Sequence, residues 1–122
     1  MNKVSLTIWG RVFEINVVFD CYAGESPTAT QQQALQNFIA RPDLLDNVKA
    51  EVEKYCQKKD STIIVDNIFK FVIPQSLFVQ RTKNNVHVVG VMCAFKLDLE
   101  HGLAIVFKNE QFDQIGTQDV IL

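Results

Sequence analysis

The densest group of side chains that could do chemistry lies at Asp98-Leu99-Glu100-His101-Gly102. Two carboxylates and an imidazole within four residues can bind a divalent metal ion or transfer protons. The same residue types also fill tight turns between strands, where Gly102 would supply a positive φ. Three interpretations are therefore open here: a structural turn, a partner-binding surface, and a metal or catalytic site.

Other signs of catalysis are missing from the sequence. It contains no glycine-rich phosphate loop, no GxSxG, no HExxH, and no cluster of Cys and His at zinc spacing. Three cysteines, Cys21, Cys56 and Cys93, form no CxxC pair, and their odd number favours free thiols in a reducing compartment. We therefore expect no cofactor and no bound metal.

Negative charge is concentrated near the C-terminus. Residues 98–122 carry five acidic residues and one lysine, whereas residues 1–97 carry eleven basic and nine acidic residues. An acidic surface attracts a basic partner at long range. Charged residues also protect exposed sheet edges from pairing, so edge protection stays open as a second interpretation of these acidic residues. If the acids bind a partner, we expect its contacts to be Asp98, Glu100, His101, Glu110, Asp113, Gln118 and Asp119.

The spacing of apolar residues predicts the elements that position these side chains. Alternation over residues 3–9 and 12–21 predicts an antiparallel hairpin that turns at Gly10. Thr28 and Gln31 match a capping box at the start of a first helix. A second helix is expected to begin at Pro42 and to bury Leu45, Val48, Val52 and Tyr55.

The second half of the chain is rich in strand patterns. An extended segment is expected over residues 61–74, followed by strands at 77–81, 86–97, 103–107 and 112–115. The order of these elements predicts an α+β fold. Its antiparallel twisted sheet would consist of the N-terminal hairpin and a C-terminal meander. The two helices would be inserted after the first hairpin and packed on one face.

Length and apolar content limit the organisation and location of the chain. Its 122 residues fit a single domain over residues 1–122, and 48% hydrophobic residues fit a folded globular chain. The N-terminus lacks the apolar stretch of a signal peptide, and no apolar run approaches the ~20 residues of a membrane span. We therefore expect a cytoplasmic protein. The net charge of −2 gives no sign of general nucleic-acid binding.

Two short motifs flank the strand Leu103 to Phe107. Asp98 precedes Glu100-His101-Gly102 on one side, and Gly116-Thr117-Gln118-Asp119 follows on the other. In these motifs the C-terminal third resembles a bacterial family of small domains of unknown function. Trp9-Gly10 and the helix opening from Thr28 to Ala34 also resemble the family's pattern.

The resemblance extends to immunity proteins encoded beside secreted bacterial toxins, including contact-dependent growth inhibition systems. It implies a non-catalytic protein that neutralises a cognate toxin, often a basic nuclease, by tight binding, without contacting nucleic acid or membrane itself. The alternative is a small metal-dependent or hydrolytic enzyme that uses the turn from Asp98 to His101. A third interpretation is a module that pairs with itself through an exposed sheet edge.

Overall fold

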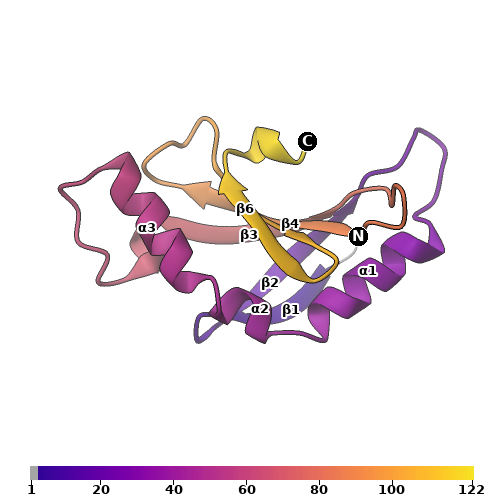
Figure 1. Cartoon of the computed structure of the whole chain (residues 1–122), viewed down its shortest axis with the longest axis horizontal. Coiled ribbons are helices and arrows are strands. Elements are labelled where there is room, and N and C mark those ends of the chain that lie inside the picture. The colour runs from indigo at the N-terminus through magenta and orange to yellow at the C-terminus, as the bar shows by residue number, and fades with distance from the viewer. Residues whose placement is uncertain (1–2) are drawn as a thin grey trace.

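A six-stranded sheet forms the centre of the protein in the computed structural model, which describes residues 3–122 (Figure 1). The strands lie side by side in chain order: β1 (Lys3–Ile8), β2 (Arg11–Phe19), β3 (Val72–Val79), β4 (Val88–Phe95), β5 (Leu103–Lys108) and β6 (Gln111–Gly116). Every neighbouring pair except one is antiparallel. The expected α+β class is confirmed, and the sheet is mostly antiparallel.

The exception is the pair formed by β2 and β3. These strands run parallel from Asn16 opposite Ser76 to Phe19 opposite Val79, so the prediction of a wholly antiparallel sheet is wrong. Parallel neighbours need a crossover of a dozen or more residues. The 52 residues between β2 and β3 contain the helices and provide that crossover.

Three helices occupy this crossover, where two were expected. They are α1 (Ala29–Ile39), α2 (Asp43–Asp46) and α3 (Lys49–Lys59). The predicted capping box is present at α1. The backbone N–H of Gln31 donates to Thr28 Oγ1 at 3.1 Å, and the backbone N–H of Thr28 donates to Gln31 Oε1 at 2.9 Å. The predicted second helix is interrupted at Val48, whose φ of −108° and ψ of 4° leave the helical range. Leu44 and Leu45 of α2, before this break, are both buried.

The segment before β3 also differs from its prediction. Residues 61–67 are irregular, a short 3₁₀ helix η1 (Ile68–Lys70) follows, and β3 begins at Val72, before Pro74. Pro74 lacks an N–H group and is expected to end a strand. It is tolerated here because β2 pairs with β3 only from Ser76 onward and a bulge follows Pro74 opposite β4.

Most of the core lies between the helices and one face of the sheet. Phe38 of α1 and Val52 of α3 pack in the same buried cluster as Ile15, Leu77 and Ile105. The other face carries a smaller cluster of Met92, Ala104, Val106 and Ile121. Ile121 follows the 3₁₀ helix η2 (Gln118–Val120) near the chain end, which lies at the top of Figure 1, away from α1 and α2.

Trp9 connects the first hairpin to the helices. Its indole Nε1 donates to the Leu45 carbonyl at 2.9 Å, and its ring lies 5.9 Å from that of Phe69. Trp9 has a φ of 50°, a left-handed conformation that is uncommon for a bulky residue. The contacts of the indole compensate for this strain and give the Trp9-Gly10 pair a structural role.

The cysteines are free, and two of them are deeply buried. Cys56 and Cys93 have no exposed surface, whereas Cys21 is partly exposed. Burial raises the pKa of Cys56 to about 11 and raises the pKa of Cys93 as well. These two thiols are therefore protonated at neutral pH and unsuited to nucleophilic work.

No helix within residues 3–122 is long and apolar enough to cross a membrane.

Candidate functional site

Asp98 organises the turn between β4 and β5. Its carbonyl accepts a hydrogen bond from the Gly102 amide at 2.9 Å, and its carboxylate accepts one from the His101 amide at 3.3 Å. The His101 ring nitrogen Nδ1 lies 3.0 and 3.1 Å from the two carboxylate oxygens. Gly102 has the expected positive φ, 64°. The turn is thus closed by its own backbone and by an Asp–His pair.

The two members of this pair shift each other's protonation. The hydrogen bond from His101, assisted by its charge, lowers the pKa of Asp98. The same bond and the charge of Asp98 raise the pKa of His101, with smaller contributions from Glu100 and Asp119. Lys59 at the end of α3 adds a distant ion pair, with Nζ 3.9 Å from the Asp98 carboxylate. The Asp98 carboxylate therefore contacts both the His101 ring and the Lys59 ammonium group.

Gln118 joins the two motifs that were identified in the sequence. Its amide donates to the His101 carbonyl at 3.0 Å, and its side-chain Nε2 donates to the Cys93 carbonyl at 3.1 Å. A Cβ atom at Gly102 would lie 2.6 Å from that Nε2. Glycine is therefore favoured by its own positive φ, and a larger residue would also displace the Gln118 side chain. This gives Gln118, one of the expected partner contacts, a structural role.

This packing leaves four side chains on the outside of the joined motifs. Leu99 is 76% exposed, and Glu100, His101 and Asp119 are also exposed. We call these four residues the C-terminal turn surface. It combines an apolar side chain with two carboxylates next to an imidazole whose pKa they help to raise.

Two of the predicted contacts lie elsewhere. Glu110 lies in the turn between β5 and β6, and the pKa of Arg41 is raised mainly by its hydrogen bond to Asp43 and least by the charge of Glu110. Asp113 lies in β6, with its carboxylate 3.7 Å from Lys108 Nζ. This turn is at the other end of β5, which at six residues spans about 20 Å. The seven predicted contact residues therefore form two groups rather than one patch.

The metal interpretation of the Asp98 turn depends on a third ligand. Within residues 3–122, no group of three or more His, Cys, Asp or Glu side chains is placed to hold one ion. The Asp–His pair can exchange a proton, and Glu100 lies beside it in the chain. The enzyme alternative stays a prediction.

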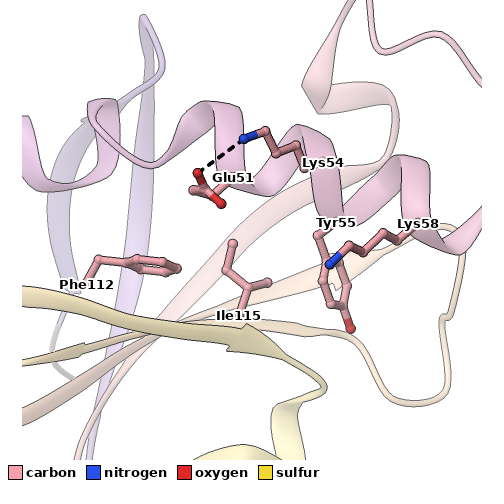
Figure 2. A pocket seen from close by; sticks show the side chains of 6 residues that line it. All are labelled: Glu51, Lys54, Tyr55, Lys58, Phe112 and Ile115. Carbon is pink, nitrogen blue, oxygen red and sulfur yellow. Dashed lines mark ion pairs between the residues drawn. The ribbon is translucent and has the colours of Figure 1, made fainter.

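Sequence reasoning missed a groove between α3 and the edge strand β6 (Figure 2). One hollow of about 210 Å³ is lined by Glu51, Lys54, Tyr55, Lys58, Phe112 and Ile115. A second hollow of about 460 Å³ shares Glu51 and Phe112 with it and continues toward α2 along Leu44, Asn47, Val48, Phe107 and Gln111. The only signals in the sequence were Phe112 and Ile115, two apolar residues in a strand whose other side chains are polar.

Fold and site together define a small α+β domain whose mostly antiparallel sheet carries an Asp–His turn clamped by a C-terminal glutamine. The chain belongs to the family described as Domain of unknown function (DUF6985), whose family model matches residues 1–122. No curated protein and no solved structure matches it. Membership of a family of unknown function is thereby confirmed, and the likeness to immunity proteins stays a prediction.

Proposed function

We propose that the protein is a non-catalytic immunity protein that binds a cognate bacterial toxin through the C-terminal turn surface and neutralises it. The observation that supports this proposal is the clamp formed by Gln118, whose two hydrogen bonds to backbone carbonyls join the segments that carry Leu99, Glu100 and Asp119. A surface that is ordered before binding loses less conformational entropy on association. Leu99 and the polar residues around it have the arrangement of an interface core within a polar rim.

The acidic residues favour a basic partner, such as a nuclease whose cleft normally holds phosphates. Glu100 and Asp119 would mainly accelerate encounter, since charge at the rim of an interface acts on the association rate. Leu99 would mainly slow dissociation, because 76% of its surface is available for burial against the partner. The mechanism would be stoichiometric occlusion in the cytoplasm.

Co-expression with the product of the gene immediately upstream tests the function. We expect a one-to-one complex in a pull-down of the tagged protein, and loss of the upstream product's toxicity in cells that make both. An upstream product that is harmless and forms no complex would contradict the proposal.

Matched charge reversals then test the location of the interface. The double variant Glu100→Lys/Asp119→Lys should lower the association rate about tenfold at low salt. Glu110→Lys/Asp113→Lys makes the same change in net charge at the other end of β5 and should have a smaller effect. Equal effects of the two variants, measured by surface plasmon resonance, would place the interface outside the C-terminal turn surface.

A further inference from the structure

Strand β6 carries an irregularity that brings two apolar side chains to one face. Phe112 pairs with Phe107 and Gln114 pairs with Val106, so Asp113 between them has no partner and forms a bulge. Phe112 and Ile115 are three residues apart and would point to opposite faces of a regular strand. The bulge restores their alignment, and both line the groove beneath α3. Bulges that re-aim side chains are frequent next to functional sites.

The backbone of β6 is open on its outer side. It is the last strand in the sheet order, and within residues 3–122 no strand pairs with its outer edge. Four of its six residues, Gln111 to Gln114, are exposed, including Phe112 with 40% of its surface. Unpaired N–H and C=O groups on such an edge can accept an additional extended segment.

The groove above this edge has the length and charge to select such a segment. Along α3 it runs from Glu51 to Lys58, about 10 Å, which corresponds to about three residues of extended chain, and it continues to Asn47 in the connection to α2. Lys54 Nζ lies 3.7 Å from the Glu51 carboxylate in an exposed ion pair. Lys58 makes no ion pair with any residue of the described chain. Figure 2 shows Phe112 and Ile115 pointing from β6 toward α3, which carries both lysines.

We propose that this groove binds an extended acidic segment of a partner protein, which adds to β6 as a further strand. An apolar side chain of the segment packs on Phe112 and Ile115, and a carboxylate pairs with Lys58. The groove would prefer an acidic ligand, whereas the C-terminal turn surface would prefer a basic one. The two surfaces share no residue, so this proposal and the immunity proposal can fail independently.

Selection from a library of random linear octapeptides against the immobilised full chain tests this proposal. We expect the enriched peptides to carry an apolar and an acidic residue two positions apart, because such residues share one face of an extended segment. Their dissociation constants are then measured by fluorescence anisotropy. The variants Phe112→Ala and Lys54→Glu/Lys58→Glu should each weaken binding at least about tenfold, the loss of one anchor or one charge pair.

Two control variants separate the groove from general effects. Lys83→Glu/Lys96→Glu makes the same change in net charge at exposed positions outside the groove, and Val12→Ala removes a 65%-exposed apolar side chain on β2. Both should bind the peptides as the natural chain does. Failure to enrich acidic peptides, or equal binding by all variants, would overturn the proposal. A wild-type dimer that Phe112→Ala dissociates would assign the edge to a second copy and overturn it too.

Discussion

Gly102 and Gln118 show why two distant short motifs occur together in this chain. Gly102 lets the turn after Asp98 close with a positive φ and leaves room for the Gln118 amide group. Gln118 in turn donates to two carbonyls, those of Cys93 and His101, that flank the turn. The two motifs therefore form one packing contact between the β4–β5 turn and the chain end.

Replacement of this glycine should be costly. We expect Gly102→Ala to lower the free energy of unfolding by about 2–3 kcal/mol, because a left-handed alanine costs roughly 1–2 kcal/mol and displaced Gln118 loses a hydrogen bond worth about 1 kcal/mol. Gly24→Ala is the matched control, with a φ of 83° and no atom within 4 Å of the new Cβ. This control should lose only the roughly 1–2 kcal/mol of unfolding free energy that a left-handed alanine costs. Equal losses in urea denaturation would show that the contact with Gln118 contributes nothing.

The Asp98–His101 pair should make stability depend on pH in two directions. The folded-state pKa of His101 is raised above 6.5, so its contribution is complete below pH 6.5 and is lost as the pH rises through the folded-state pKa. The folded-state pKa of Asp98 is lowered below 3.8, so its contribution is complete above pH 3.8 and is lost as the pH falls through that lower pKa.

The variant Asp98→Asn tests this coupling. The difference in unfolding free energy between the natural chain and the variant should be largest between pH 4 and 6.5, on the pKa directions above. The NMR titration of the His101 ring should shift to lower pH in the variant. An unchanged titration would mean that the two side chains do not interact in solution.

At the scale of elements, the chain end acts as the cover of the second sheet face. Ile121 is 2% exposed, and its backbone carbonyl accepts a hydrogen bond from Gln80 Nε2 at 2.6 Å. A Cβ atom at Gly90 would lie 2.5 Å from Ile121 Cδ1, so the glycine leaves the space that the isoleucine fills. The last few residues are therefore part of the folded structure.

Truncation of this side chain should have a large effect. We expect Ile121→Ala to lower the free energy of unfolding by about 2–4 kcal/mol, as for other buried isoleucines. Leu122→Ala at the adjacent position, where the side chain is 74% exposed, should change it by less than about 0.5 kcal/mol. Similar midpoints for the two variants in chemical denaturation would show that Ile121 does not cover the sheet in solution.

Local signals in the sequence were sufficient for most elements but not for their irregularities. The Thr28 capping box and the alternation in β1 and β2 depend on neighbouring residues and could be read directly. The bulge at Asp113 could not, because nothing in the strand pattern marks an extra residue. The groove along α3 follows from that bulge, and it was missed for this reason.

For the whole molecule, the main error of the sequence prediction was the relative direction of β2 and β3, which are parallel. Short turns force antiparallel pairing between β1 and β2 and between the strands from β3 onward. The long connection between β2 and β3 allows either direction, and no local pattern decides between them. The same limit applies to the site: the Asp98 turn is local and predictable, whereas its contact with Gln118 is set by how β6 returns along β5.

The parallel pair has a consequence for the nascent chain. Synthesis completes the hairpin of β1 and β2 long before β3, which ends at Val79. During that interval the edge of β2 from Asn16 to Phe19 has no strand to pair with. Unpaired apolar edges promote pairing between molecules. Fragments of this chain that stop before Val79 should therefore aggregate by pairing between the exposed edges of their β2 strands. Rapid translation through the helical segment would limit this aggregation.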